Sequence, residues 1–371
     1  MLQAGIIGLP NVGKSTLFNA LTNSHVLSAN YMFATLEPNV GVVTIIDKRL
    51  NEIGRITNAK KIIPTSLEFV DIPGLVSGAS KGEGLGNKFL DSIRNVDALC
   101  HVIRCFNDPN ISHVFAEVDP VNDALTVELE LILADLDVIN KRIDRLHKKV
   151  LVDKIASEKL EYETLVLIKE NLEKEIPINK LNLTVEEKKA IKSYNFLTEK
   201  PLMYIANLKD DDLLDIENNT YYQSLLAYAK KNNIKVVPLS IKLADDLKEF
   251  SEEEEKEYLE ELGLTDFRLN NVITGAYELL GLETFFSFLS GETRAWTYKK
   301  GMTAKECAGV IHTDFEKGFI RAETVSYDDL VSLGSYQKAK EAGKVRLEGK
   351  EYLVKDGDIL SFRFNVWENK N

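Results

Sequence analysis

Cysteine, tryptophan and proline are scarce in this sequence, and long apolar runs are missing. Its 371 residues include 3 Cys, 2 Trp and 9 Pro. No apolar run approaches the ~18–20 residues of a membrane-spanning helix, and the start MLQAGIIGLP carries no basic residue, so we expect neither a membrane segment nor a signal peptide. The cysteines form no metal-binding spacing and suit a reducing cytoplasm. Cys100 and Cys105 lie in an apolar, strand-like run and are interpreted as buried structural thiols, with a redox role as the alternative.

Positive charge is also in deficit. The chain has 46 Lys and Arg against 58 Asp and Glu, a net charge of −12, which argues against wholesale coating of nucleic acid. Residues 281–371 contain 14 basic and 14 acidic residues and are neutral. The surplus acid therefore lies in the first 280 residues, and nucleic-acid contact is favoured near the C-terminus.

The first 120 residues alternate short apolar runs with turns and helical stretches. The expected strands are Gln3–Gly8, Val40–Ile46, Leu67–Asp71 and Ala98–Cys105. Several are apolar on both faces, which is typical of a mainly parallel sheet covered by helices. The sheet pattern resumes at 200–208 and 234–240. The sequence thus predicts an α/β domain formed by residues 1–122 and 200–280.

Residues 123–199 are expected to be a helical insertion in this domain. Apolar residues recur at spacings of three and four from Leu129 to Val150 and again from Leu165 to Ile176. Two such apolar seams joined near 151–160 predict an antiparallel helical hairpin or coiled coil. The alternative is that both helices pack on the main core. The acidic stretch around 249–261 is interpreted as a solvated helix face.

Residues 281–367 are expected to form a third domain. TRAWTYKKG is a strand pattern, Thr303 and Glu306 have capping-box spacing, and Asp356-Gly357 is a turn signal between further strands. Strands with one helix in this length predict a small ubiquitin-like β-grasp fold of the α+β class.

The segment GLPNVGKST is a phosphate-binding loop. It follows an apolar strand and precedes a helical stretch, which is the context that this loop requires. Backbone amides turn toward the β-phosphate and the helix N-terminus adds its positive dipole. Lys14 is expected to reach the β- and γ-phosphates, and the Ser15 hydroxyl to ligate Mg²⁺.

Two further segments complete a nucleotide switch. Asp71, at a strand end in DIPG, can hold Mg²⁺ through water, and the Gly74 amide can sense a γ-phosphate. Thr35 offers a second hydroxyl ligand in a loop that orders around a bound γ-phosphate; the alternative is a loop threonine without function. Many switch GTPases place a water-orienting glutamine after Asp-x-x-Gly. Here that residue is Leu75, so hydrolysis needs a partner or another side chain.

Eight longer segments carry a resemblance to one family: GLPNVGKSTLFNALT, EPNVGVV, GLVSGASKGEGLGNKFL, HVIRCF, YIAN, RAWT, HTDFEKGFIRAE and EGKEYLVKDGDI. Over nearly its whole length the chain resembles the YchF family, the Obg-related P-loop nucleotidases with a helical insertion and a C-terminal TGS domain. The resemblance implies a cytoplasmic ATPase that prefers ATP over GTP and associates with the ribosome or its large subunit, and with rRNA. We expect a monomer without membrane contact.

The resemblance also implies roles for individual residues. Mg²⁺ ligands match Ser15 and Thr35, and Leu75 matches the hydrophobic residue that replaces the catalytic glutamine. A histidine proposed to act in catalysis matches His113, for which a purely structural role is the alternative. The phosphate loop of the family matches Asn11, Val12, Gly13, Lys14, Ser15 and Thr16.

The base motif departs from the family. Guanine-specific switch proteins read Asn-Lys-x-Asp and the family reads Asn-x-x-Glu, whereas this chain has Asn207-Leu208-Lys209-Asp210. Leu208 cannot lay a lysine stem over guanine, although Asp210 could grip its N1 and 2-amino group. We predict that ATP is preferred and GTP is partly tolerated. Asn207 and Leu208 are expected to shape the base pocket, with Ser240 and Ile241 on the opposite loop.

Three other functions share some of these motifs. A regulatory switch whose output is partner binding, and in which hydrolysis only limits the lifetime of the bound state, has every one of these motifs. A P-loop kinase would need an arginine-rich lid and an acceptor pocket, which the sequence does not indicate. A ribosome- or RNA-binding adapter would require a dispensable nucleotide site, so loss of Lys14 would leave its function intact.

Overall fold

The computed structural model describes residues 2–23, 40–73, 85–115, 117–153, 156–248, 250–264, 269–289 and 291–365. The chain divides into two compact units. The first consists of Met1–Gly41 and Glu68–Ala276, and the second of Val42–Leu67 and Tyr277–Asn371. Neither unit is continuous in the sequence.

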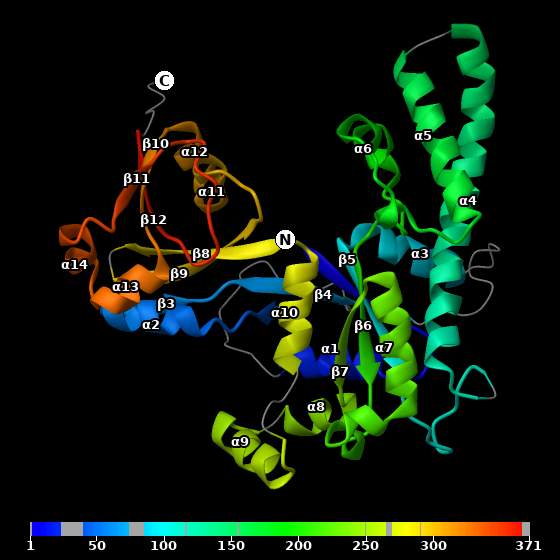
Figure 1. Ribbon diagram of the computed structural model, residues 1–371, viewed down its shortest axis with the longest axis horizontal. Helices are drawn as coiled ribbons and strands as arrows, with labels where there is room; N and C mark the ends of the chain where they lie inside the picture. Colours follow the sequence, from blue (N-terminus) through cyan, green and yellow to red (C-terminus); the bar gives the residue numbers. More distant parts are fainter. Residues whose placement is uncertain are drawn as a thin grey trace. The chain divides into compact units, whose positions relative to one another are not determined.

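The first unit is built on a six-stranded sheet with the order β2-β4-β1-β5-β6-β7 (Figure 1). Strand β1 pairs in parallel with β4 and β5, and β5-β6 and β6-β7 are parallel too. Every residue of β5 is buried, because helices cover both faces of a parallel sheet. The predicted α/β class is confirmed. The strands are β1 (Gln3–Ile7), β2 (Val40–Thr44), β4 (Ser66–Asp71), β5 (Ala98–Arg104), β6 (Leu202–Asn207) and β7 (Lys235–Leu239).

The helices of this unit connect the strands or extend beyond them. They are α1 (Lys14–Asn23), α3 (Leu85–Asn95), α4 (Pro120–Asp153), α5 (Ala156–Leu172), α6 (Val185–Ile191), α7 (Thr220–Asn232), α8 (Ile241–Leu247), α9 (Glu252–Glu261) and α10 (Leu269–Leu279). Short 3₁₀ turns lie at Ile178–Lys180, Lys192–Tyr194, Asp211–Leu213 and Ile216–Asn218. Among the described helices, none is long and apolar enough to cross a membrane.

Helices α4 and α5 form the predicted antiparallel hairpin, which extends away from the sheet in Figure 1. The hairpin has its own apolar core, which includes Ile139, Leu146, Leu165 and Ile168. The alternative, packing of both helices on the main core, is therefore wrong for this part of α4. The predicted seam begins too early, because Leu129 is 44% exposed.

Buried Asp135 fastens the chain where it returns from the hairpin. Its carboxylate accepts from the Leu197 amide at 3.0 Å and from the Thr198 amide and hydroxyl at 2.8 Å. Three donors on one carboxylate offset the cost of burying its charge.

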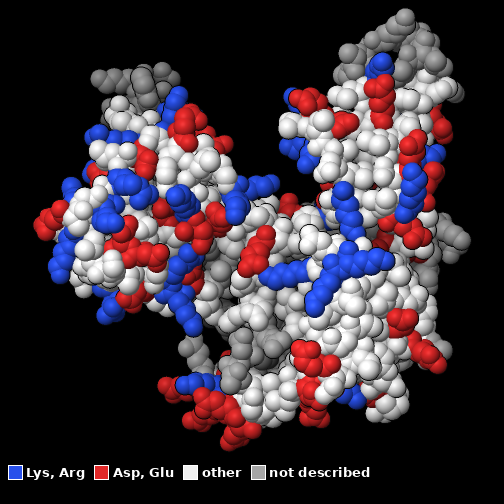
Figure 2. Space-filling view, in the orientation of Figure 1, with Lys and Arg blue, Asp and Glu red and all other residues white. Residues whose placement is uncertain are grey.

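Helix α9 accounts for the acidic stretch. Ser251 caps it with a complete capping box to Glu254, and among its described side chains only Leu259 is buried, against Leu243 and Leu247 of α8. Figure 2 shows acidic side chains gathered at its lower edge, where Figure 1 draws α9. The interpretation as a solvated helix face is confirmed.

The second unit contains a separate six-stranded sheet with the order β11-β10-β12-β8-β9-β3. Its strands are β3 (Lys61–Ile63), β8 (Leu282–Leu289), β9 (Glu292–Lys299), β10 (Phe319–Val325), β11 (Arg346–Glu348) and β12 (Ile359–Phe364). Its helices are α2 (Lys48–Ile56), α11 (Ala304–Ile311), α12 (Thr313–Lys317), α13 (Tyr327–Leu333) and α14 (Tyr336–Glu341). The predicted capping box of Thr303 and Glu306 starts α11.

The prediction of one helix in the C-terminal region is wrong. Helices α12, α13 and α14 follow α11 there, and each spans only five to seven residues. Such lengths are too short to show an apolar period, so side-chain caps are their main sequence signal. Ser326 and Ser335 supply two of these caps. The assignment to the TGS class stays a prediction.

Residues 42–67 pack with the C-terminal part of the chain. Leu50 and Ile53 of α2 share an apolar cluster with Phe286 and Val325. Strand β3 continues the sheet by pairing in parallel with β9. The predicted domains instead assigned residues 1–122 to the nucleotide-binding part, and those boundaries stay a prediction.

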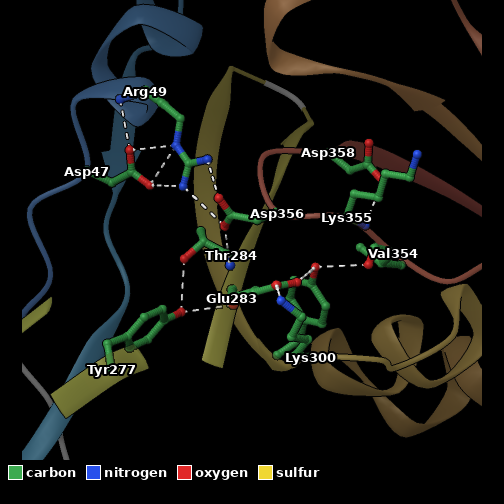
Figure 3. Close-up of polar contacts among 11 residues, drawn as sticks. Asp47, Arg49, Tyr277, Glu283, Thr284, Lys300, Val354, Lys355, Asp356 and Asp358 are labelled. Carbon is green, nitrogen blue, oxygen red and sulfur yellow. Dashed lines mark hydrogen bonds and ion pairs between the residues drawn. The ribbon is translucent and has the colours of Figure 1, made fainter. Parts of the chain in front are cut away.

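A polar network joins α2 to the C-terminal residues of the second unit (Figure 3). The Arg49 guanidinium contacts Asp47 at 2.8 Å and Asp356 at 2.6 Å. Asp356 also accepts a hydrogen bond from the Thr284 amide at 3.0 Å. Arg49 thus connects the start of α2 to the turn before β12.

All three cysteines are buried and unpaired, as the apolar context of Cys100 and Cys105 predicted. Burial raises the pKa of the Cys100 and Cys307 thiols to about 12. Thiols with such pKa values remain protonated near neutral pH and are poor nucleophiles.

Candidate nucleotide-binding site

The phosphate-binding loop connects the end of β1 to the start of α1. Its backbone has left-handed φ angles at Gly8 (147°), Asn11 (62°) and Gly13 (103°). A Cβ atom on Gly8 would lie 2.5 Å from the Val102 carbonyl oxygen of β5, so only glycine fits there. Leu9 and Val12 are 2% exposed and anchor the loop in the core. The amides at the start of α1 remain directed at an anion site.

Lys14 begins α1 and lies buried across this loop. Its Nζ donates to the Leu9 carbonyl oxygen at 2.6 Å, and the residue is only 7% exposed. Burial lowers the pKa of Lys14 to about 8, while the nearby carboxylate of Asp71 opposes that shift. Ser15 follows and is exposed, and Thr16 is half-buried.

Asp71 ends β4 on the strand next to β1. Its Oδ1 atom is buried and has no hydrogen-bond partner among the described residues. The unpartnered carboxylate oxygen of Asp71, close enough to Lys14 to act on its pKa, and the exposed Ser15 next to Lys14 in the sequence are oxygen donors that fit Mg²⁺, which takes one or two protein oxygens and completes its shell with water and phosphate. The described residues contain no cluster of three or more His, Cys, Asp or Glu for an all-protein metal site.

Asn207, at the end of β6, holds the phosphate loop from the other side. Its Nδ2 donates to the Val12 carbonyl oxygen at 3.0 Å, and its Oδ1 accepts from the Ile241 amide at 3.1 Å. One buried side chain thereby joins the phosphate loop to the start of α8. A Cβ atom on Gly13 would lie 3.0 Å from Nδ2 and 3.2 Å from the Ile241 Cδ1.

Asp210 contacts the N-cap residue of α8 and a lysine in the first turn of that helix. The Ser240 hydroxyl, which also caps that helix, donates to Asp210 Oδ1 at 2.5 Å. The Lys242 amine lies 3.7 Å from Oδ2. The carboxylate retains free lone pairs, because each of its oxygens can accept two hydrogen bonds.

Leu208 has its side chain in the apolar core. It is 1% exposed and clusters with Cys105, Tyr204 and Tyr222. Its backbone amide donates to the Leu239 carbonyl oxygen at 2.9 Å. Its predicted contribution to a base pocket stays a prediction, and in this arrangement its side chain lines no open surface.

His113 lies in the loop between β5 and α4, next to the phosphate loop. Asn11 Nδ2 donates to the Ser112 Oγ at 3.0 Å and connects the two loops. The His113 Nε2 atom is 3.2 Å from Asp123 Oδ2, and their side chains are 7% and 2% exposed. This contact lacks the alignment of a hydrogen bond. Burial lowers the pKa of His113, and the positive charge of Arg104 adds to that effect.

Comparison with known proteins shows the family of the chain. Residues 3–149 match a family described as 50S ribosome-binding GTPase, and residues 282–365 match the C-terminal family of YchF GTPases, described as a protein of unknown function. The ribosome-binding ATPase YchF of Bacillus subtilis is 51% identical over 98% of this chain and 100% of its own length. The chain belongs to the YchF family.

Other YchF proteins agree with this assignment. The ribosome-binding ATPase YchF of Mycoplasma genitalium is 48% identical over 99% of this chain and 100% of its own. The solved structure titled as the YchF GTPase of Schizosaccharomyces pombe is 35% identical, with a TM-score of 0.88 over 98% of this chain and 97% of that one. The names of these relatives differ in the nucleotide that they state.

Most of the predicted site residues of this YchF protein lie around one loop. Asn11 to Thr16, Asp71, Asn207, Ser240, Ile241 and His113 all lie within or border the segment between β1 and α1, or connect to it through the contacts above. Thr35, Gly74 and Leu75 lie outside the described residues.

Sequence reasoning missed Asp123 and Arg104. Arg104 is 1% exposed and donates to the carbonyl oxygens of Phe106, Asp108 and Ile111, which shapes the loop that carries His113. A charged residue within the apolar run ALCHVIRCF was the available signal. Nothing in the sequence pattern pairs Asp123 with His113.

Proposed function

We propose that this chain is an ATP-hydrolysing nucleotide switch that acts with Mg²⁺ and binds ribosomes. Its membership of the YchF family supports nucleoside-triphosphatase activity, and the names of the Bacillus subtilis and Mycoplasma genitalium relatives favour ATP and ribosome binding. The observation that carries the proposal is the preformed phosphate loop, with Lys14 buried across it and the Asp71 Oδ1 partnerless beside it. A ribosome-binding role implies the cytoplasm, and we propose a monomer.

The phosphates would be held by the chain itself. The amides from Val12 to Thr16 face the β-phosphate, and the Lys14 amine leaves the Leu9 carbonyl oxygen to contact the β- and γ-phosphates. Ser15 and Thr35 would ligate Mg²⁺ directly, and Asp71 would hold it through water. When bound, Mg²⁺ neutralises charge on the β- and γ-oxygens. The Gly74 amide would report the presence of the γ-phosphate.

Hydrolysis needs a group other than Leu75. Leucine neither donates nor accepts a hydrogen bond, so it cannot orient the attacking water. His113 is the side chain that we propose for this task, because the Asn11–Ser112 contact holds its loop against the phosphate loop. Replacing His113 by Ala should lower kcat while nucleotide affinity stays within about threefold, since the phosphate-binding groups are unchanged.

Base selection would depend on the loop around Asn207. The Asn207 side chain is occupied by Val12 and Ile241, and Asp210 is partly occupied by Ser240 and Lys242. Adenine offers an acceptor and an amine donor, which backbone groups can satisfy, whereas guanine needs a free carboxylate. We therefore propose that ATP is preferred, with limited acceptance of GTP through the remaining lone pairs of Asp210.

Competitive binding of ATP and GTP analogues with Mg²⁺ tests the base assignment. Asp210→Asn removes the charge that guanine needs, with little change in size. The parent should prefer ATP, and the variant should lose GTP affinity about tenfold, the equivalent of one buried charge-assisted contact, while ATP affinity stays within threefold. A parent that binds both equally or prefers GTP would overturn the assignment. Leu208→Lys is a poorer probe, because it would bury a charge at a site that is 1% exposed.

Cosedimentation with ribosomes tests the switch. The parent should bind ribosomes differently with a non-hydrolysable ATP analogue and with ADP, and Lys14→Ala should abolish that difference. If Lys14→Ala retained both the difference and the cellular function, the chain would be an adapter with a dispensable nucleotide site.

A further inference from the structure

We propose that Asp123 is a positioning residue for His113, which holds one ring nitrogen of the imidazole so that the other faces the nucleotide. The inference rests on the catalytic role proposed above for His113. It adds a residue of α4 to the machinery of the phosphate loop.

The contact between the two side chains is close and buried. His113 Nε2 and Asp123 Oδ2 are 3.2 Å apart, and the side chains are 7% and 2% exposed. Neither Asp123 oxygen nor His113 Nε2 has a hydrogen-bond partner among the described residues. Buried polar atoms without partners cost ~1–3 kcal/mol each, so a small ring rotation that aligns this contact is favourable.

The backbone around His113 is already held in place. Arg104 fixes the preceding loop through the carbonyl oxygens of Phe106, Asp108 and Ile111, with N–O distances of 3.0 Å. Asn11 of the phosphate loop holds Ser112, the residue before His113. The His113 ring meets Phe115 edge to face, with ring centroids 6.0 Å apart, and Asp123 is placed to set which ring nitrogen carries the hydrogen.

Asp123 is itself held in place by the start of a helix. It lies in the first turn of α4, and its backbone amide donates to the Asp119 carbonyl oxygen at 2.9 Å. Burial raises the pKa of Asp123 to about 7, the charge of Asp119 raises it further, and Arg104 opposes both. The Cys105 thiol is a neighbouring titratable group whose pKa is raised by burial and then by the charges of Asp123 and Asp212.

The orientation fixes which nitrogen can accept a proton. A carboxylate at Nε2 favours the tautomer with hydrogen on Nε2 and a lone pair on Nδ1. In the reaction, the water oxygen bonds to the γ-phosphorus, the bond from that phosphorus to the bridging oxygen breaks, and ADP departs. Nδ1 takes the proton of the water and returns it to the released phosphate or to solvent.

Asp123→Asn and Asp123→Glu in the full chain test the proposal. Asp123→Asn preserves the size but can present its amide to Nε2, so kcat should fall at least tenfold while KM and nucleotide affinity stay within threefold. Asp123→Glu should recover part of the loss. Glu117→Gln is the matched control, because it removes an exposed carboxylate of the loop between His113 and α4, and its kcat should stay within about threefold.

Nuclear magnetic resonance of the imidazoles supplies a readout that a merely structural role would not change. The chain has five histidines, so His113 can be assigned by substitution. The ¹⁵N shifts of the parent should show hydrogen on Nε2, and Asp123→Asn should move the tautomer population toward hydrogen on Nδ1, because the new amide can donate to Nε2. Hydrogen on Nδ1 in the parent would overturn the proposal without any variant at Asp123.

The two proposals fail in different ways. If His113→Ala keeps full turnover, the catalytic role of His113 is wrong. If His113→Ala loses turnover but folded Asp123→Asn keeps kcat within twofold, only the positioning role of Asp123 is wrong.

Discussion

Asp356→Ala should destabilise the second unit by about 1.5–3 kcal/mol, because two different contacts depend on this carboxylate. One is the Thr284 amide, which donates to it at 3.0 Å from a residue that is 3% exposed. Leaving that donor buried without an acceptor costs ~1–2 kcal/mol. The other is the ion pair with Arg49 at 2.6 Å, whose side chains are 29% and 44% exposed. Solvent screens such a pair, so its share is ~0.5–1 kcal/mol.

Asp356→Asn is the matched control. Its amide oxygen still accepts from Thr284, while the charge that faces Arg49 is gone, so the expected loss is only about 1 kcal/mol. Urea unfolding followed by tryptophan fluorescence measures both, because Trp296 lies in β9 of the second unit. A loss below 0.5 kcal/mol for Asp356→Ala, or equal losses for both variants, would refute the assignment of most of the energy to the Thr284 amide.

Two further substitutions test the first unit. His101 is 1% exposed with both ring nitrogens lacking partners among the described residues, and burial lowers its pKa to about 3. The native state therefore binds fewer protons than the unfolded state between about pH 3 and 6.5, and stability falls on acidification through that window. His101→Leu should raise the free energy of unfolding by ~1–2 kcal/mol at pH 7, as measured by urea unfolding. It should also reduce the fall in that free energy between pH 6.5 and 4.5, and an unchanged fall would contradict this. Gly13→Ala should weaken ATP binding at least tenfold by calorimetry, since its Cβ would press on Asn207 and Ile241 at a φ of 103°; unchanged affinity would show that the loop tolerates the strain.

Features that depend on neighbouring residues could be predicted from the sequence. The phosphate loop follows from the spacing of Gly8, Gly13 and Lys14 between a strand and a helix, and the capping box at Thr303 from four consecutive residues. The strands β1, β4 and β5 were found to within one residue at each end; β1 and β5 are almost entirely buried and mostly apolar, whereas β4 alternates buried and half-buried residues.

Features that depend on distant partners could not be predicted. Leu50 and Ile53 read as one side of an ordinary amphipathic helix, and nothing local indicates that Phe286 and Val325 cover them. Burial of Leu208 is decided by Tyr204 and Tyr222 around it, not by its place in the base motif. Likewise the approach of His113 to Asp123 depends on how Arg104 holds the loop that precedes His113.

The division of the chain has a consequence for its synthesis. Residues 42–67 leave the ribosome early, but the apolar partners of Leu50 and Ile53 begin beyond Tyr277, 210 positions after Leu67. At ~5–20 residues per second, α2 and β3 wait about 10–40 s for the surfaces that cover them. The nascent chain thus carries an unpaired strand and an uncovered apolar helix face through most of translation. Completion of the second unit ends that exposure. Burial of residues 42–67 therefore depends on the last quarter of the chain.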